Sequence, residues 1–199
     1  MLTLHGARDT DALLAAHHSS YGTRTMSVTI RPATPADLPH IVRIYAPAVL
    51  TGSSSFETEP PDEMEMARRM KYVLEGGYPY LAAEIGGRFA GYAYASVYRT
   101  RPAYRFSVED SIYIDPDMQR RGAGHALLKA LIGECEQRGF RQMLAVIGDS
   151  PNQAASVGLH EACGFGVVGQ LPGIGYKFGR WVDTLLMQRA LGEGMRSNP

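Results

Sequence analysis

Apolar residues along the chain alternate between strand-like and helix-like spacing. Short apolar runs predict seven strands, at 28–31 and in the segments "PYLAAEI", "RFAGYAYASVY", "SVEDSIYI", "RQMLAVI", "FGVVGQL" and "WVDTLLMQRAL". Helical spacing predicts four helices, one after Thr34, one from about Asp62, one over about 122–138 and one over about 153–163. The predicted order is β-α-α-β-β-β-α-β-α-β-β. Strands that alternate with helices in this way indicate an α/β fold with a mixed sheet.

Turn and capping residues mark where these elements begin and end. Thr34, Pro35 and Asp37 fit a capping box before the first helix, and Pro47 should disturb the end of that helix. Gly86-Gly87 between two apolar runs predicts a two-residue hairpin. The second helix is expected to bury one side, made of Met66, Met70, Val73 and Leu74.

The first 26 residues differ in pattern from the rest of the chain. They are weakly patterned and end in turn-forming residues, whereas a strand and a helix start follow directly after Met26. We therefore expect an N-terminal extension over 1–26, either flexible or forming a short helix, and one domain over 27–191. Residues 192–199 are expected to form a C-terminal tail.

Composition narrows the classes of protein. The 199 residues carry 20 Lys+Arg and 20 Asp+Glu, and this zero net charge argues against a surface built for nucleic acid. The two cysteines, Cys135 and Cys163, match no zinc spacing, so we expect free thiols and no metal. The sequence shows no membrane-length apolar run and no signal-peptide pattern, which favours a cytoplasmic protein without a membrane partner.

The loop "DPDMQRRGAG", residues 115–124, follows an apolar strand and precedes a helix. It fails as a Walker A loop because no Gly-Lys-Ser/Thr follows. It also fails as a dinucleotide fingerprint, because Leu127 occupies the position of the third glycine. The remaining interpretation is a pyrophosphate cradle, in which successive backbone N–H groups and a helix N-terminus point at one anion while Arg120 and Arg121 add positive charge.

Two motifs in the chain resemble those of a known enzyme family. Residues 119–124, namely Gln119, Arg120, Arg121, Gly122, Ala123 and Gly124, match the Q/R-x-x-G-x-G/A element of GCN5-related N-acetyltransferases (GNAT). Residues 152–165, "NQAASVGLHEACGF", resemble that family's second element. The resemblance implies the GNAT fold, a mixed central sheet flanked by helices, with acetyl-CoA as co-substrate bound through its pyrophosphate at 119–124.

Further segments are similar to one subfamily, the phosphinothricin acetyltransferases, which includes methionine sulfoximine and methionine sulfone acetyltransferases. These segments are "IRPAT", "FETEP", "VEDSIYIDP" and "GYKFGRWVD", and the resemblance covers about residues 28–190. It implies a homodimer that acetylates a small amino-acid-like amine. Leu128 stands where enzymes from herbicide producers have tyrosine, a departure that argues against strict phosphinothricin specificity.

Acetyl transfer to an amine needs a group that removes a proton, because an α-amine is mostly protonated below roughly pH 8. Glu109 and Asp110 interrupt an apolar strand, and from the residues alone either carboxylate could be this base or a structural pair. The resemblance favours Glu109. It also implies that the backbone of Ser111, Ile112, Tyr113 and Ile114 pairs with the pantetheine arm, and a bulge in this strand would free those backbone groups.

The second motif contributes three candidate site residues. Asn152 fits an N-cap that opens the last helix, and the resemblance adds a hydrogen bond to CoA. Ser156 is expected to cap the helix or contact the cofactor arm. The resemblance gives His160 an acid or base role, although a lone helical histidine is more often structural. Cys163 is expected to be a core residue and not an acyl carrier.

The substrate candidates lie in "YRTRPAYRF", residues 98–106. Arg99 and Arg101 with Tyr104 suggest recognition of an anionic acceptor, since guanidinium groups match carboxylate and phosphinate oxygens, although a solvated basic loop is the simpler interpretation. Phe56 could supply an aromatic wall. The "GYKFGRWVD" segment is expected to shape the pocket or a dimer interface, with Trp181 as a possible core residue.

The sequence therefore predicts an acetyl-CoA-dependent N-acetyltransferase for a small amine, with direct attack of the amine on the thioester. Two rival hypotheses remain open at this stage. The acceptor could be a peptide N-terminus, a polyamine or an aminoglycoside, although cationic acceptors would favour an acidic pocket. The chain could instead be an acyl-CoA-binding module without catalysis, against which the presence of Glu109 and His160 argues.

Overall fold

The computed structural model describes residues 27–199, so the expected extension over 1–26 lies outside the described residues. Its strands are β1 (Val28–Pro32), β2 (Tyr80–Ile85), β3 (Arg88–Val97), β4 (Ser107–Ile114), β5 (Gln142–Gly148), β6 (Gly166–Lys177) and β7 (Arg180–Ala190). Its α-helices are α1 (Leu38–Leu50), α2 (Glu63–Glu75), α3 (Ala123–Gln137) and α4 (Ala154–Ala162). This order confirms the mixed α/β prediction, and the expected C-terminal tail remains close to the domain through Arg141, which donates to Ser197 and Asn198.

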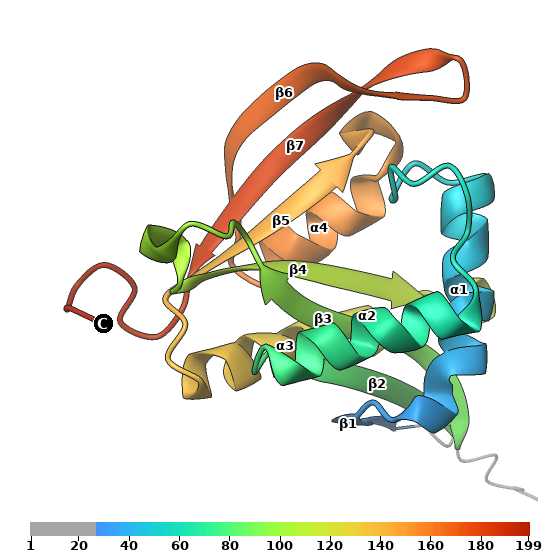
Figure 1. The fold of residues 1–199 in the computed structure, drawn as a ribbon, viewed down its shortest axis with the longest axis horizontal. Helices are drawn as coiled ribbons and strands as arrows, with labels where there is room; N and C mark the ends of the chain where they lie inside the picture. The colour runs from blue at the N-terminus through green and yellow to red at the C-terminus, as the bar shows by residue number, and fades with distance from the viewer. Residues whose placement is uncertain (1–26) are drawn as a thin grey trace, which may run out of the picture.

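The strands form one seven-stranded sheet in the order β1-β2-β3-β4-β5-β7-β6 (Figure 1). Every neighbouring pair is antiparallel except β4 and β5, which run parallel. That parallel pairing covers only Ser107–Glu109 of β4, after which the two strands diverge. The sheet therefore opens beside β4 from residue 110 onward, and one edge of that strand is left without a strand partner.

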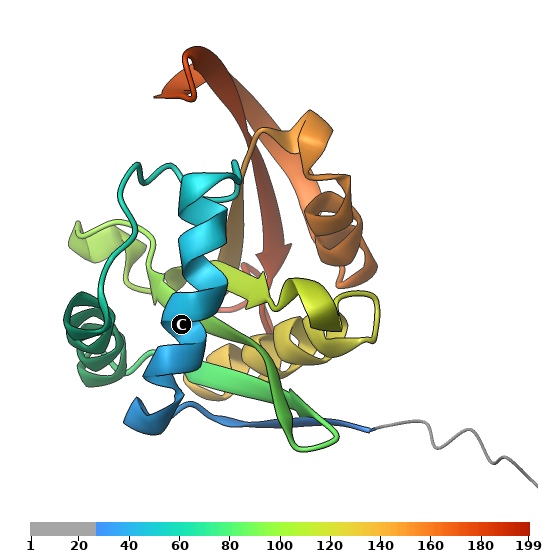
Figure 2. The same cartoon turned by 90° about the vertical axis from the view of Figure 1, so that its right-hand side faces the viewer.

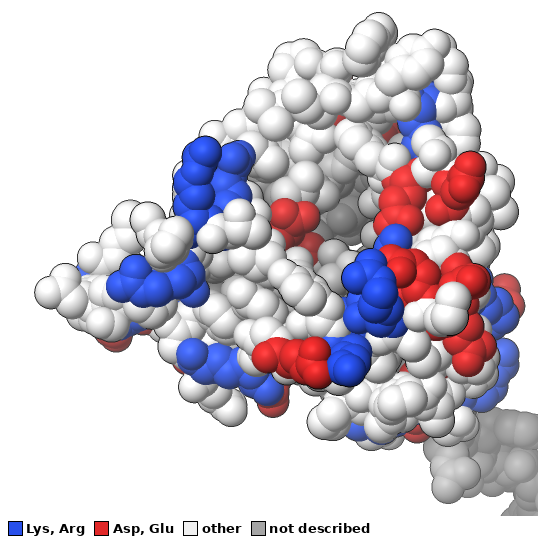
Figure 3. All heavy atoms as spheres, in the orientation of Figure 1, with Lys and Arg blue, Asp and Glu red and all other residues white. Residues whose placement is uncertain are grey.

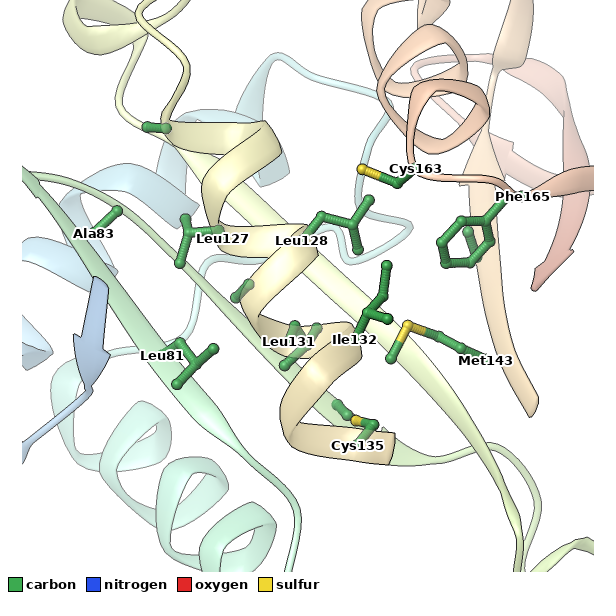
Figure 4. Packing of buried hydrophobic residues seen from close by; sticks show 14 of the residues in the cluster. Leu81, Ala83, Leu127, Leu128, Leu131, Ile132, Cys135, Met143, Cys163 and Phe165 are labelled. Carbon is green, nitrogen blue, oxygen red and sulfur yellow. The ribbon is translucent and has the colours of Figure 1, made fainter. Parts of the chain in front are cut away.

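The two faces of the sheet carry separate cores. Helices α1 and α2 cover one face, and α3 and α4 cover the other (Figure 2). On the second face, α3 presents Leu127 and Leu131 toward β2, and Leu128 and Ile132 toward Cys163 and Phe165 (Figure 4). Both cysteines are buried free thiols, and burial raises the pKa of Cys135 to about 12, so neither resembles a reactive thiolate.

Local signals explain most element boundaries. Thr34 and Asp37 form the expected capping box, with the Thr34 N–H donating to the Asp37 carboxylate at 2.8 Å. Ile85 pairs with Arg88 across Gly86-Gly87, whose φ angles of 58° and 76° are those of a tight hairpin that glycine favours.

Pro47 lies inside the last turn of α1, which continues to Leu50 with Ile44 and Val49 buried on either side of the proline. Two sequence expectations were wrong in detail. Leu74 is 45% exposed, since it lies at the edge of the stripe that buries Met66, Met70 and Val73. Trp181 is 68% exposed and is not a core residue. It lies on the β6–β7 hairpin, where it packs edge-on against Tyr176.

Among the described residues, no helix is long and apolar enough to cross a membrane. The same residues contain no group of three His, Cys, Asp or Glu side chains arranged to hold a metal ion.

Candidate active site

Two cavities meet where β4 and β5 diverge. One, of about 410 Å³, contains Glu109 and is called the Glu109 cavity below. The other, of about 540 Å³, lies against residues 119–125 and is called the glycine-loop cavity. They share the lining residues Ser54, Ile112, Tyr113, Gln153 and Ser156. Figure 3 shows a hollow below the β6–β7 hairpin with acidic side chains on both sides of it. A molecule in one cavity would thus lie next to a molecule in the other.

The glycine-loop cavity lies against the segment that leads into α3. Gln119, Arg120, Gly122, Ala123 and Gly124 line it, whereas Arg121 is exposed and does not. The first backbone hydrogen bond that closes α3 runs from the Ala126 N–H to the Gly122 carbonyl, so the N–H groups before Ala126 have no partner within the helix. Arg120 and Gly122 adopt positive φ angles of 58° and 86°, which turn the chain sharply into the helix. The arrangement is suited to an anion such as a pyrophosphate.

The free edge of β4 connects the two cavities. Ser111 lines the Glu109 cavity, Ile114 lines the glycine-loop cavity, and Ile112 and Tyr113 line both. The β3–β4 ladder runs from Gly91↔Ile114 to Val97↔Val108 without a register shift, so the expected bulge is absent from these strands. Divergence from β5 frees the backbone instead, and an extended ligand arm could pair along this edge.

Glu109 is the half-buried carboxylate of the first cavity. Burial raises the pKa of Glu109 to about 7, and the negative charge of Asp110 adds to the shift. Among residues 27–199, no cation or hydrogen-bond donor opposes this shift. A carboxylate that titrates near neutral pH can both take up and release a proton under ordinary conditions, as a general base must.

Asp110 points to the other side of β4 and pairs with His160 of α4. The His160 Nε2 lies 3.0 Å from the Asp110 carboxylate, and Nδ1 lies 2.7 Å from the Ser156 carbonyl. Burial lowers the pKa of His160, but the hydrogen bond and charge of Asp110 outweigh it, so the pKa lies above its ordinary value. Both partners carry acceptor oxygens, an arrangement that favours a proton on each ring nitrogen and agrees with the raised pKa. Both acids line the Glu109 cavity, but Asp110 is paired with His160, whereas Glu109 has no cationic or hydrogen-bonding partner among the described residues.

The loop after α1 forms the opposite wall of the Glu109 cavity. It contributes Ser54, Ser55, Phe56 and Glu57. The Tyr45 hydroxyl lies 2.8 Å from the Ser55 hydroxyl and donates to Glu57 at 2.9 Å. Arg69 of α2 then binds Glu57 at 2.6 Å. Phe56 therefore lies at the cavity, as the sequence suggested, within a loop that polar contacts hold in place.

Two groups of predicted residues lie elsewhere. Arg99, Arg101 and Tyr104 line neither cavity; Arg99 stacks on the Tyr98 and Tyr104 rings with its guanidinium carbon 5.2 and 5.9 Å from the ring centroids. Asn152 does not cap α4, which begins at Ala154 after a short 3-10 turn. Its side chain instead donates to Asp149 at 3.0 Å, outside both cavities.

Sequence reasoning missed several lining residues, namely Tyr45, Tyr94, His125, Gln153 and Thr184. Tyr45 was predicted only as part of an apolar helix face, and its hydroxyl gave no signal of a polar role. His125 directly follows the first motif, so extending that motif by one position would have found it. Gln153 lies within the second motif, next to Asn152, but was not singled out there. Nothing in the local pattern around Tyr94 or Thr184 distinguishes them from other strand residues.

Comparison with known proteins identifies the protein family. A family model described as an acetyltransferase (GNAT) domain matches residues 30–186. The chain is 53% identical over 171 residues to a phosphinothricin N-acetyltransferase of Alcaligenes faecalis, covering 86% of each chain. It is 39% identical over 175 residues to an L-methionine sulfoximine/L-methionine sulfone acetyltransferase of Pseudomonas aeruginosa, covering 87% of this chain and all of the relative.

A solved structure supports the same assignment. The crystal structure of a GNAT phosphinothricin acetyltransferase from Sinorhizobium meliloti in complex with AcCoA matches with a TM-score of 0.84 and 48% identity, over 87% of this chain and 94% of that one. The chain belongs to the GNAT acetyltransferase family. It is an acetyl-CoA-dependent acetyltransferase, as the sequence predicted.

The residues present fit acetyl-CoA. The free N–H groups at the start of α3 suit its pyrophosphate, and a Cβ on Gly124 would lie 3.4 Å from Leu159, in the space beside the cavity. The free edge of β4 leads from there toward Glu109. The bound molecule supplies an acetyl thioester, and the protein supplies the anion cradle, the edge and the titratable groups.

Proposed function

We propose that the protein transfers acetyl from acetyl-CoA to the α-amine of a small amino-acid-like acceptor. The acceptor is of the phosphinothricin, methionine sulfoximine or methionine sulfone type, as in the named activities of the relatives. The Glu109 cavity, at about 410 Å³, is large enough for such a molecule and too small for a folded substrate. The acceptor amine attacks the thioester carbonyl directly, with no acyl group on the protein.

The observation that carries this proposal is the Glu109 carboxylate in the cavity with a pKa of about 7. At neutral pH a substantial fraction of it is ionised and can accept the proton that the amine must lose, directly or through a water molecule. Asp110 is not the base in this proposal, because His160 already engages its carboxylate. The contact between Asp110 and His160 supports Glu109 as the base, whereas the residues alone left the choice between the two acids open.

His160 is the second titratable group that we assign to the reaction. It lines the Glu109 cavity, and its imidazolium is paired with Asp110. We assign it the acid role, in which its positive charge compensates negative charge on the leaving sulfur. Both ring nitrogens are engaged, by the Ser156 carbonyl and by Asp110, so transfer of a ring proton to the sulfur requires that one of these hydrogen bonds breaks.

Arg99, Arg101 and Tyr104 remain our proposed contacts to the anionic part of the acceptor. The loop that carries them begins directly after the Val97↔Val108 pair, one residue from Glu109 along β4. Arg101 is exposed, and no ion pair engages it among residues 27–199. A guanidinium there can approach the cavity mouth when an acceptor carboxylate or phosphinate is present.

We also propose a homodimer that forms through the β6–β7 hairpin, and a cytoplasmic location, for which the two free thiols are suited. The hairpin exposes a set of large apolar side chains: Val167, Val168, Leu171, Ile174, Tyr176, Phe178 and Trp181. Apolar patches of this extent usually mark an interface. A second copy fits because the same apolar surface is present on both molecules. Sedimentation should show a dimer that Trp181→Glu dissociates.

The substrate proposal is tested by a thiol-release assay with acetyl-CoA across a panel of amines. The panel contains phosphinothricin, methionine sulfoximine, methionine sulfone, a dipeptide, spermidine and an aminoglycoside. We expect the highest kcat/KM with one of the first three. A higher value with any of the last three would overturn the acceptor assignment while leaving the acetyltransferase class intact.

A further inference from the structure

Lys177, at the end of β6, is a buried cation with an unusual set of partners. It is 4% exposed. Its Nζ donates to the carbonyl oxygens of Gly52 at 2.9 Å and Ser55 at 2.5 Å, with Ala48 at 3.5 Å as a third acceptor. All three carbonyls belong to the end of α1 or the loop that follows it. One side chain from the C-terminal hairpin thus binds a segment more than 120 positions earlier in the chain.

The geometry matches the chemistry of an ammonium group. An ammonium has three donors and no acceptor, and here three carbonyls face it. The ion pairs of residues 27–199 do not include Lys177, and its burial lowers the pKa of the ammonium. The negative end of the α1 dipole and the loop carbonyls compensate the charge in place of a carboxylate. A neutral apolar side chain of similar length would leave these carbonyls without their donor.

The same strand constrains the loop at a second point. The Phe56 ring lies against Gly175 of β6 and Gly148 of β5 so closely that a Cβ would come within 2.3 Å of it at Gly175 and 2.4 Å at Gly148. Any side chain at either position would displace the ring. Lys177 and Gly175 therefore hold consecutive residues of the loop, Ser55 and Phe56, on one strand of the hairpin.

This loop is the wall of the Glu109 cavity that contributes Ser54, Ser55, Phe56 and Glu57. In Figure 1 the tip of the β6–β7 hairpin reaches over to the side of the molecule where this loop leaves α1. The glycine-loop cavity takes only Ser54 from the loop, and its proposed anion-binding residues lie at 119–124, before and at the start of α3. A shift of the loop would therefore alter the Glu109 cavity more than the acetyl-CoA site.

We propose that Lys177 is a positioning residue that determines acceptor affinity by fixing loop 53–57 as a wall of the Glu109 cavity. The inference rests on the proposed function of that cavity as the acceptor site. Lys177 touches no reacting atom in this assignment and acts through Ser55 and Phe56. The β6–β7 hairpin thus stabilises the wall of the acceptor cavity in addition to exposing an apolar surface.

The test compares Lys177→Met with Lys129→Met, an exposed lysine on α3, in the full chain. Three quantities are measured: the KM of the best amine in the panel, the acetyl-CoA dissociation constant by calorimetry, and amide hydrogen exchange over 52–57. For Lys177→Met we expect at least about a tenfold rise in acceptor KM, an acetyl-CoA affinity within about twofold of the parent, and faster exchange at 52–57. Lys129→Met should match the parent in all three.

An unchanged acceptor KM, or an equal loss of acetyl-CoA affinity, would overturn the assignment. If Lys177→Met does not fold, Gly175→Ala takes its place, because its Cβ displaces Phe56 while the ammonium stays. A raised acceptor KM with an unchanged acetyl-CoA dissociation constant in Gly175→Ala supports the proposal, and the absence of that difference rejects it. Hydrogen exchange is measured without any acceptor, so it reports on the loop whatever the substrate is. Faster exchange together with an acceptor outside the proposed class would therefore reject the substrate class but keep the positioning role.

Discussion

The two cavities of this protein are built in different ways. One continuous stretch, residues 112–124, supplies more than half of the residues that line the glycine-loop cavity, among them Gly122 and Gly124, which present only backbone. The residues that line the Glu109 cavity instead come from separate parts of the chain, namely α1, the α1–α2 loop, β3, β4, β5, α4 and β7. A glycine turn depends on chain conformation, whereas a carboxylate depends on its own chemistry. Substitutions of Gly122 and of Glu109 should therefore have different effects on acetyl-CoA affinity and on catalysis.

The largest effect is expected for Glu109→Gln. The amide cannot accept a proton, so kcat should fall by about 10²- to 10⁴-fold, the usual contribution of a general base. The acetyl-CoA dissociation constant should stay within about twofold, because the anion cradle is untouched. Glu161→Gln, an exposed change on α4, serves as the control and should leave kcat at the parent value. Equal losses of kcat and acetyl-CoA affinity would remove Glu109 as the base.

The pH profile sharpens the same assignment. Because the Glu109 pKa is raised to about 7, the group is protonated and inactive as a base below that pH. We expect kcat/KM to rise about tenfold per pH unit up to about pH 7 and then less steeply, as far as titration of the acceptor amine allows. The rise of kcat/KM below about pH 7 should be absent in Glu109→Gln. In the parent enzyme its midpoint should be the same for acceptors whose amines have different pKa values, whereas a midpoint that moves with the acceptor would report titration of the substrate.

The glycine-loop cavity should respond to conformation. Gly122 has a φ of 86°, which an L-residue adopts at a cost of roughly 1–2 kcal/mol. Gly122→Ala should therefore raise the acetyl-CoA dissociation constant by about tenfold, measured by calorimetry, with a smaller change in kcat at saturation. Gly133→Ala is the matched control: it lies within α3, a Cβ there meets no atom within 4 Å, and it should stabilise the protein by about 0.5–1 kcal/mol. Similar affinities for both variants would contradict a cradle that depends on backbone conformation.

The same contrast explains which parts of the site the sequence could predict. The turn at Gly122 and the start of α3 leave a local pattern of glycines and helix formers, so a motif of six residues was enough to predict an anion site there. The pairing of Asp110 with His160 joins residues 50 positions apart and leaves no local pattern. Only tertiary structure could separate the partnered Asp110 from the unpartnered Glu109. The contact of Lys177 with the loop also joins distant residues, and the sequence indicated only that residues 175–183 shape the pocket or a dimer interface.

For the secondary-structure elements too, local features could be predicted and features that depend on distant contacts could not. Periodicity and caps located every strand and helix, because these signals lie within one segment. Burial of individual side chains was harder to predict than the elements themselves. Leu74 and Trp181 are apolar, but no neighbouring element covers them in the described chain. The opening of the sheet also came from an unexpected source. It results from divergence of β4 and β5 after Glu109, and not from a bulge within β4.

The smallest expected effect concerns the basic loop. Arg101→Ala should raise the KM of an anionic acceptor by about three- to tenfold, since an exposed guanidinium contributes only modestly to binding in water. Arg105→Ala in the same loop is the matched control, because its guanidinium donates to the Pro102 carbonyl and stacks on Phe106 at 4.3 Å, within the loop itself. Raising the salt concentration should weaken the Arg101 effect and leave Arg105→Ala unchanged. If both variants keep the parent KM, the acceptor's anionic group is held by other residues, and the Glu109 cavity recognises it without help from this loop.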